Sequence, residues 1–445
     1  AACTGSHGVG SVTGWPSIRT GPNACAVMAA TTGDGPNVAN ARVAAAKLAV
    51  TSTAVKNAAL LAMAAALEAQ QSEILAANER DMTAAAAKGM KSSMLDRLKL
   101  TAERISGMAD GLRQVAGLAD PVGNVIDGKT LPNGLHITKI RVPLGVIGII
   151  YEARPNVTAD AAGLCLKSGN AVILKGGSEA MESNKTVAAI LAQAAEGAGI
   201  PAGSIQFIDT SDRQAVQDLI HMNGLVDVVI PRGGAGLIQA VVRNASVPVI
   251  ETGAGVCHTY VDKDADVEMA MKIAFNAKVQ RPSVCNAMET LLVHKDIADK
   301  FLPMMLMMYN SSAVEIRGDE AVQEYSGQVH PVTEEDWSTE YGDLRLSVKI
   351  VDSIEEAMAH IAKYGTGHSE CIVTNNYQAA QLFQYTVDAA AVYVNASTRF
   401  TDGNEFGFGA EIGISTQKLH ARGPMALPEL TSTKYLINGN GQVRK

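Results

Sequence analysis

The sequence lacks three features that mark common classes of protein. No run of apolar residues approaches the roughly 20 that a membrane-spanning helix needs. None of its six cysteines stands in a C-x-x-C pair or at a zinc-site spacing from a histidine, so no metal centre is expected. The G-x-G-x-x-G pattern is also missing, and with it the standard fingerprint of a dinucleotide-binding turn.

Basic residues are scarce relative to acidic ones. The chain has 37 lysines and arginines against 45 aspartates and glutamates, which gives a net charge of −8. Neither nucleic acid nor an anionic membrane is therefore expected as the main partner. An anionic substrate would have to be held by arginine and lysine placed locally. The scattered cysteines indicate free thiols in a reducing compartment, and a cytoplasmic enzyme is the working class.

The first part of the chain changes pattern several times. Residues 1–36 are rich in Gly, Ser, Thr and Pro, and we expect a flexible tail there. From about Asn40 to Ala116, apolar residues recur every three or four positions, which predicts helices. The alternating stretch Leu135–Val142 predicts one strand of a hairpin, and the continuous apolar run Val146–Tyr151 predicts a buried strand.

Apolar strands then alternate with amphipathic helices from Asp160 to Asn244, and again from Val261 to about Asn395. This alternation is typical of parallel βαβ units that are covered on both faces. The first block looks like a nucleotide-binding sheet. A last strand-like segment, Thr433–Ile437, can pair with the early hairpin or with a neighbouring subunit.

One motif match is rejected on its context. Residues 123–130 fit the phosphate-loop pattern G-x-x-x-x-G-K-T, which needs a strand before it and a helix after it. Here Leu131 and Pro132 follow the match and cannot begin a long helix. A kinase or ATPase, which would depend on Lys129, is therefore disfavoured.

A candidate nucleophile lies between Lys278 and Thr290. Cys285 follows a turn at Pro282 and directly precedes an apolar strand, with Lys278 and Arg281 close in sequence. Nearby cations lower the pKa of a thiol and favour the nucleophilic thiolate. A buried structural cysteine is the alternative, and the local pattern leaves both interpretations open.

Two glycine turns follow predicted strands. Lys175 to Ser178 leads into one helix, and Arg232-Gly233-Gly234 leads into another. Backbone amides at the start of a helix suit a phosphate group, and ligands of open α/β sheets bind at this edge. Tight turns favour glycine even without a ligand, so one such turn would be weak evidence, and the prediction of a phosphate site depends on the presence of two.

Polar side chains also follow two other strands. Arg154 can clamp a carboxylate or a phosphate, and Asn156 can donate hydrogen bonds to an oxyanion. Helix capping by Thr158 or Asp160 is the other interpretation of this segment. Arg399, after the last strand of the second block, is a candidate for a second substrate-binding turn.

These segments together resemble the γ-glutamyl phosphate reductases of proline biosynthesis, a branch of the aldehyde dehydrogenase superfamily. The resemblance covers nearly everything from about residue 45 to the C-terminus. It depends on long, specific strings: 142–160, 165–175, 285–294, 393–400 and 411–417.

The resemblance implies an aldehyde dehydrogenase-like α/β fold in three parts. A Rossmann-like NADPH domain would comprise residues 37–120 and 141–260, and an α/β catalytic domain residues 261–417. A small β arm from residues 121–140 and 418–445 would bridge subunits, as a homodimer or homotetramer. Association with glutamate 5-kinase is a further expectation.

The resemblance also implies roles for individual residues. Cys285 would be the nucleophile, and Asn156 would contact the oxyanion. The cofactor NADPH would contact a set of five residues: Lys175, Ser178, Gly233, Gly234 and Glu340. Arg154, Arg281 and Arg399 would hold the phosphate and the α-carboxylate of the substrate.

The expected reaction is the NADPH-dependent reduction of L-glutamyl 5-phosphate to L-glutamate 5-semialdehyde, with release of phosphate, through a thioester on Cys285. Two alternatives stay open. Glu251 falls near the general base of hydrolytic relatives, which would suit an NAD(P)-dependent hydrolytic aldehyde dehydrogenase. A non-catalytic binding protein on the same fold would not need the thiol at all.

Overall fold

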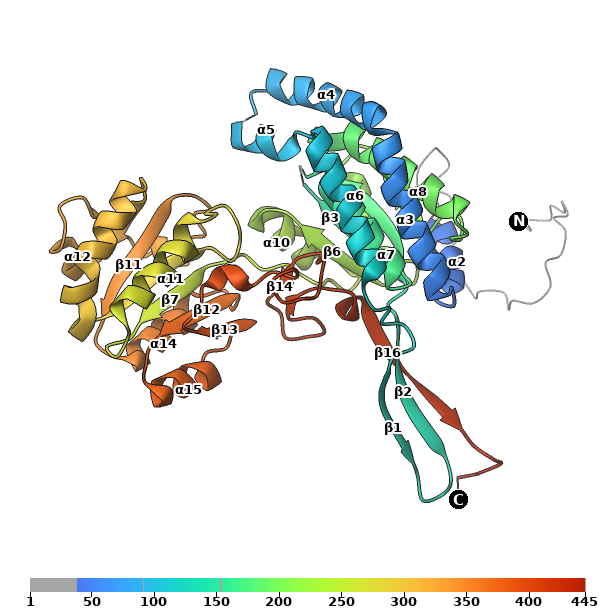
Figure 1. The fold of residues 1–445 in the computed structure, drawn as a ribbon. Coiled ribbons are helices and arrows are strands. Elements are labelled where there is room, and N and C mark those ends of the chain that lie inside the picture. The colour runs from blue at the N-terminus through green and yellow to red at the C-terminus, as the bar shows by residue number, and fades with distance from the viewer. Residues whose placement is uncertain (1–37, 91, 153, 445) are drawn as a thin grey trace, which may run out of the picture.

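The computed structural model describes residues 38–90, 92–152 and 154–444 of the chain. Two parallel sheets, each with helices on both faces, lie side by side, and a narrow antiparallel sheet projects away from them (Figure 1). The predicted tail, residues 1–36, lies outside the described residues, as do Cys3 and Cys25.

The smaller parallel sheet has four strands in the order β5-β4-β3-β6. Their bounds are Val146–Tyr151 for β3, Ala171–Gly176 for β4, Ile205–Phe207 for β5 and Val228–Arg232 for β6. The continuous apolar run at β3 is a buried strand with the predicted bounds. This strand lies between β4 and β6. Both of its faces meet helices, so no position along it suits a polar side chain.

Successive side chains of β3 belong to two different cores. Ile147 and Ile149 pack in the larger core, whereas Val146 and Ile150 pack in the other. The helices of the larger core are α3 (Thr53–Ala69), α4 (Gln71–Ala87), α6 (Ala102–Gly117), α7 (Asn156–Lys167) and α8 (Met181–Gly197). Those of the other core are α2 (Val38–Leu48), α9 (Gln214–Ile220) and α10 (Ala235–Asn244), while α5 (Ser92–Leu98) packs beside α4.

The larger parallel sheet has seven strands in the order β10-β9-β11-β8-β7-β12-β13. The strands are β7 (Cys257–Val261), β8 (Met288–His294), β9 (Glu315–Gly318), β10 (His330–Pro331), β11 (Arg345–Val351), β12 (Ser369–Val373) and β13 (Ala391–Val394). Its helices are α11 (Val267–Val279), α12 (Lys295–Ser311), α13 (Glu320–Gln323), α14 (Ile354–Tyr364) and α15 (Tyr377–Thr386).

The sequence analysis missed β9 and β10, because both are too short to show a periodic pattern. The domain boundary placed at 260/261 also falls inside β7. The change from one sheet to the other therefore comes before Cys257.

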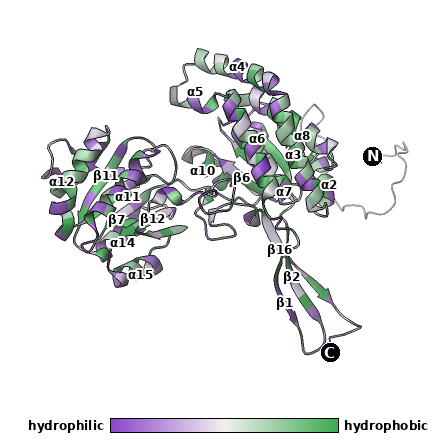
Figure 2. Cartoon of the chain, in the orientation of Figure 1, coloured by the Kyte–Doolittle hydropathy of each residue, from purple (hydrophilic) through white to green (hydrophobic). Residues whose placement is uncertain are grey.

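The projecting sheet joins two distant parts of the chain. It pairs β1 (Val125–Thr130) with β2 (His136–Pro143) and β2 with β16 (Thr431–Asn438), all antiparallel. Of the two pairings left open for the C-terminal strand, the structure has the one with the early hairpin. The boundary placed at residue 140 falls inside β2, which continues to Pro143. Hydrophobic and hydrophilic residues mix along these strands (Figure 2), in contrast to the continuous apolar run of β3.

The phosphate-loop match lies in this same hairpin. Residues 125–130 form β1, whose side chains are exposed, and a turn leads directly into β2. A strand that pairs antiparallel with its neighbour offers no helix start to hold phosphates. The rejection of that match is confirmed. A two-stranded ladder of β14 (Ile414–Ser415) and β15 (Gly423–Pro424) completes the sheets.

Adjacent leucines of α3 test how far the larger core stabilises this fold. Leu60 is fully buried, whereas 51% of Leu61 is exposed. We expect Leu60→Ala to lower the free energy of unfolding by about 2–5 kcal/mol, because it leaves a cavity. Leu61→Ala should change it by about 0.5 kcal/mol or less. Urea unfolding of both variants checks this, and equal midpoints would contradict the assigned core.

Candidate active site

A cavity of about 580 Å³ opens between the two parallel sheets, and Cys285 lines it. Charged side chains crowd its walls in a chain that is acidic overall. Five are arginines: Arg97, Arg154, Arg232, Arg281 and Arg399. Four are carboxylates: Glu152, Glu340, Asp402 and Glu411. Arginine is thus concentrated locally, as an anionic substrate requires.

The backbone of the turn that carries Cys285 is held in place by contacts with Gly255 and Cys257. A Cβ on Gly255 would collide with the carbonyl group of Cys285, so only glycine permits this close approach. The buried thiol of Cys257 donates a hydrogen bond to the same carbonyl oxygen at 3.2 Å. The turn is therefore fixed against the strand β7.

The loop after β13 is tied to the residue next to Cys285. The side-chain amide of Asn286 donates to the carbonyl oxygens of Arg399 and Thr401 at 3.3 and 2.9 Å. The hydroxyl of Thr398 donates to the carbonyl oxygen of Asn286 at 2.8 Å. These bonds bring residues 398–402 into the wall of the cavity beside Cys285.

Burial raises the pKa of the Cys285 thiol to about 11. The positive charge of Arg232 acts against this rise, whereas Glu340 and Glu411 add to it. The sequence analysis expected nearby cations to lower this pKa below its ordinary value. That expectation is wrong for the free protein, because removal of the thiol from water outweighs the guanidinium.

Lys278 does not face Cys285. Its ammonium forms an ion pair at 2.5 Å with the carboxylate of Glu289, and both side chains are buried. Lys278 is a structural residue of α11, and the cation with the largest effect on the thiol is Arg232. Closeness in sequence was misleading here, because a helical residue faces the direction that its own helix sets.

Arg232 reaches the cavity through a gap left by a glycine. It is the last residue of β6, and a Cβ on Gly413 would collide with its guanidinium. Gly413 has a φ of 136°, which also favours glycine. Arg232 belongs to the predicted glycine turn, but its sequence context predicts no role for it. Asp402 and Glu411 also received none, because no local pattern marks them.

The three arginines proposed for the substrate all line this cavity. Arg154 follows β3, Arg281 precedes Cys285, and Arg399 lies in the short helix Thr398–Phe400. The Arg399 guanidinium donates to the side chains of Gln280 and Asn286, which orient it. All three come from different segments, so only the folded chain gathers them.

The five residues expected to bind the cofactor divide into two groups. Gly233, Gly234 and Glu340 line the cavity with Cys285, whereas Lys175 and Ser178 are not among the residues around it. The ammonium of Lys175 donates at 2.8 Å to the carbonyl oxygen of Gly176, at the end of β4. The backbone amide of Gly234 donates at 2.8 Å to the carboxylate of Glu152.

The contact of Glu152 with Gly234 tests whether a dinucleotide fits. A carboxylate already sits at the N-terminus of α10, which is where a diphosphate would find backbone amides and the positive end of a helix. The turn after β4, which is separated from β6 by β3, has two glycines at the same edge of the sheet. These residues fit a dinucleotide that lies along the carboxyl ends of β4 and β6.

Asn156 is placed differently from the other predicted residues. It is the first residue of α7, it is exposed, and its amide donates to the carboxylate of Asp160 at 3.2 Å. Asn156 is not among the residues that line the cavity, although Val157 is. Its amide would have to turn away from Asp160 to reach a substrate.

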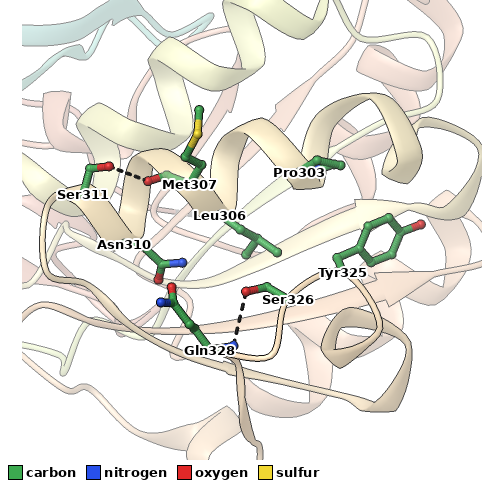
Figure 3. A pocket seen from close by; sticks show the side chains of 8 residues that line it. All are labelled: Pro303, Leu306, Met307, Asn310, Ser311, Tyr325, Ser326 and Gln328. Carbon is green, nitrogen blue, oxygen red and sulfur yellow. Dashed lines mark hydrogen bonds between the residues drawn. The ribbon is translucent and has the colours of Figure 1, made fainter.

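A second hollow of about 410 Å³ lies beside α12 (Figure 3). It is open, and none of the eight side chains that line it is charged.

In the described part of the chain, no cluster of His, Cys, Asp and Glu can hold a metal ion, and no helix is long and apolar enough to cross a membrane. The cavity at Cys285 is the candidate active site.

Comparisons with known proteins agree with this assignment. Residues 19–326 match the model of the aldehyde dehydrogenase family, whose enzymes use NAD(P). The match begins inside the segment that the sequence analysis set apart as a tail. Solved structures that share the fold include an acetylating aldehyde dehydrogenase from Geobacillus thermoglucosidasius, with 19% identity and a TM-score of 0.66 over 92% of this chain and 96% of that chain.

Relatives with higher sequence identity to this chain include several γ-glutamyl phosphate reductases. The γ-glutamyl phosphate reductase of Caldanaerobacter subterraneus is 60% identical over 91% of this chain and 98% of its own length. That of Moorella thermoacetica is 61% identical over 91% and 97%. The crystal structure of the Thermotoga maritima γ-glutamyl phosphate reductase, 49% identical, has a TM-score of 0.90 and covers 92% of this chain and 99% of that chain. The chain therefore belongs to the aldehyde dehydrogenase family and, within it, to the γ-glutamyl phosphate reductases.

Proposed function

We propose that this protein reduces L-glutamyl 5-phosphate to L-glutamate 5-semialdehyde with NADPH, and that Cys285 carries the acyl group between the two half-reactions. One observation supports this above all: the Cys285 side chain lines a cavity that also holds five arginines. An acyl phosphate brings a dianionic leaving group and a carboxylate to the thiol, and guanidinium groups are the side chains that bind both best.

The first half-reaction is an acyl transfer. The sulfur of Cys285 attacks C5 of the substrate, a C–S bond forms, and the bond from C5 to the phosphate oxygen breaks. The Cys285 thiol gives its proton to solvent as it attacks, and the electron pair of the broken bond leaves with the phosphate, which takes a proton from solvent. Arg232 faces the thiol and stabilises its anion. Arg154, Arg281 and Arg399 are the candidates that hold the phosphate and the α-carboxylate.

The second half-reaction reduces the thioester. Reduced nicotinamide, when bound at the turns after β4 and β6, would supply the hydride for C5. The oxyanion that results collapses, the C–S bond breaks, and Cys285 leaves as a thiolate. Each pair of electrons is accounted for without a deacylating water, so this second half-reaction needs no general base. Glu251, the candidate base of the hydrolytic alternative, is not among the residues around the cavity.

The chain offers two turns to hold the coenzyme. The backbone at Gly233 and Gly234 would bind the diphosphate of the coenzyme once the carboxylate of Glu152 is displaced. Glu340 would contact the coenzyme in the part of the cavity that contains Cys285. Lys175 and Ser178, at the end of β4, would face the adenosine ribose and its 2′-phosphate. A lysine at that place favours NADPH over NADH.

The projecting sheet is the proposed contact between copies. Its exposed apolar side chains include Val125, Tyr435 and Ile437, each more than half exposed. Such side chains on a sheet that leaves the body of the protein are typical of an interface. We propose a homodimer or homotetramer in the cytoplasm, with glutamate 5-kinase as the source of the labile acyl phosphate.

Cys285→Ala should abolish phosphate-dependent oxidation of L-glutamate 5-semialdehyde by NADP⁺, with a loss of at least about 10³-fold in kcat. Formation of NADPH is followed by absorbance. Cys165→Ala is the control, because Cys165 is buried in the larger core away from the cavity. Normal turnover of Cys285→Ala would sink the covalent route, and oxidation that proceeds without phosphate would favour the hydrolytic alternative.

Arg232→Gln should shift the alkylation of Cys285 by iodoacetamide to higher pH. Only the thiolate reacts, so the rate rises as the pH approaches the pKa of about 11. Loss of the Arg232 charge raises that pKa, and each unit leaves roughly tenfold less thiolate at neutral pH. Arg232→Lys should lie between the two. Superimposable pH curves for all three proteins would show that the charge does not act on the thiol.

Asn156→Ala should lower kcat by about 10²–10³-fold if its amide turns to the oxyanion during the reaction. The phosphate-dependent oxidation of L-glutamate 5-semialdehyde by NADP⁺ gives kcat and KM, and the melting temperature of the variant is measured alongside. A variant with unchanged kcat and a lower melting temperature would show instead that Asn156 serves only the start of α7, through its bond to Asp160.

A further inference from the structure

Two carboxylates of the cavity have no function in the scheme above. Glu152 accepts from the amide of Gly234, and Glu340 is the proposed cofactor contact. Asp402 and Glu411 remain. The carboxylate of Glu411 interacts with the backbone amide of Gly403, but one of its oxygens, Oε2, is buried and has no partner that meets hydrogen-bond geometry within the described part of the chain. An unpartnered buried carboxylate oxygen is costly, so it marks a place where a binding partner would be stabilising.

Asp402 and Glu411 form one wall of the cavity. Gly403, which directly follows Asp402, is buried, and a Cβ built on it would lie 3.1 Å from the Cβ of Glu411 and 3.3 Å from Oε2. Asp402 accepts at 2.9 Å from the backbone amide of Asn404, which holds its carboxylate in place.

The two carboxylates repel each other electrostatically. Burial and the charge of Asp402 raise the pKa of Glu411 to about 7, while Arg232 acts against the rise. A cation bound between Asp402 and Glu411 would relieve the repulsion and supply a donor for Oε2.

The proposed substrate has one cationic group. Its phosphate and α-carboxylate are anions and suit the arginines, but its α-ammonium needs hydrogen-bond acceptors. Arginines offer none. An amino acid therefore fits this cavity only if the cavity presents acceptors next to its guanidinium groups, as it does at Asp402 and Glu411.

We propose that Glu411 and Asp402 bind the α-ammonium group of the substrate and so select an α-amino aldehyde over the same aldehyde without the amine. This inference depends on the proposed function. It assigns these two side chains to substrate recognition and not to proton transfer at Cys285.

Two substrates separate recognition from chemistry. L-Glutamate 5-semialdehyde and 5-oxopentanoate share the aldehyde and the carboxylate, and only the first carries an amine. Both are assayed as reductants of NADP⁺ with phosphate, for the wild type, Glu411→Gln, Asp402→Asn and the control Glu405→Gln. Glu405 is exposed on the same loop and is not among the residues around the cavity. Cyclisation of the amino aldehyde cancels when variants are compared on one substrate.

We expect kcat/KM for the amino aldehyde to fall about 10- to 100-fold in Glu411→Gln and Asp402→Asn, as for the loss of a charged hydrogen bond. With 5-oxopentanoate the same variants should stay within about threefold of the wild type, and Glu405→Gln should match the wild type on both. Equal losses on the two substrates would overturn the proposal and favour proton transfer or a structural role. Unchanged activity on both would overturn it as well.

Binding without turnover keeps the test independent of the reaction. L-Glutamate should raise the melting temperature of the wild-type protein more than glutarate does, and Glu411→Gln should remove the difference. If the wild type bound L-glutamate preferentially but oxidised neither aldehyde, the recognition would stand and the proposed reaction would fail. If it oxidised the amino aldehyde but did not distinguish the two acids, the reaction would stand and the recognition would fail.

Discussion

The candidate active site depends on a partly buried sulfur atom that lies near one guanidinium. Removal from water disfavours the thiolate of Cys285, and Arg232 is the group that opposes this cost. Their proximity requires two glycines without side chains, Gly255 behind the cysteine and Gly413 beside the arginine. Any larger residue at either position would push one partner out of place, so backbone shape sets the electrostatics of the thiol.

The charges of the cavity are the reverse of those of the whole chain. A net charge of −8 does not attract an anionic substrate, yet five arginines from separate segments line the cavity that contains Cys285. Carboxylates lie between them and keep the cavity from being uniformly positive. A site with both signs of charge suits a substrate with both, which is the property that distinguishes an amino acid derivative from a simple acyl phosphate.

Much of this architecture could be predicted from the sequence. The strand Val146–Tyr151 is buried on both faces, so every position is apolar and its bounds are plain. The rejected phosphate loop failed because its neighbours could not start a helix, and it lies in the hairpin. The turn at Cys285 stood out because a thiol precedes an apolar strand. In each case the signal was local, within a few residues of the feature itself.

What the sequence by itself determined was the alternation of strands with helices and the family resemblance, and it marked Cys285 as the candidate nucleophile, because these follow from short-range patterns of apolar and turn residues. Only the tertiary structure decided which charges face that thiol. It turned Lys278 toward Glu289, placed Arg232 at Cys285 and brought Glu411 next to Asp402. Electrostatic effects depend on distance and burial, and both are set by packing between segments that lie far apart along the chain.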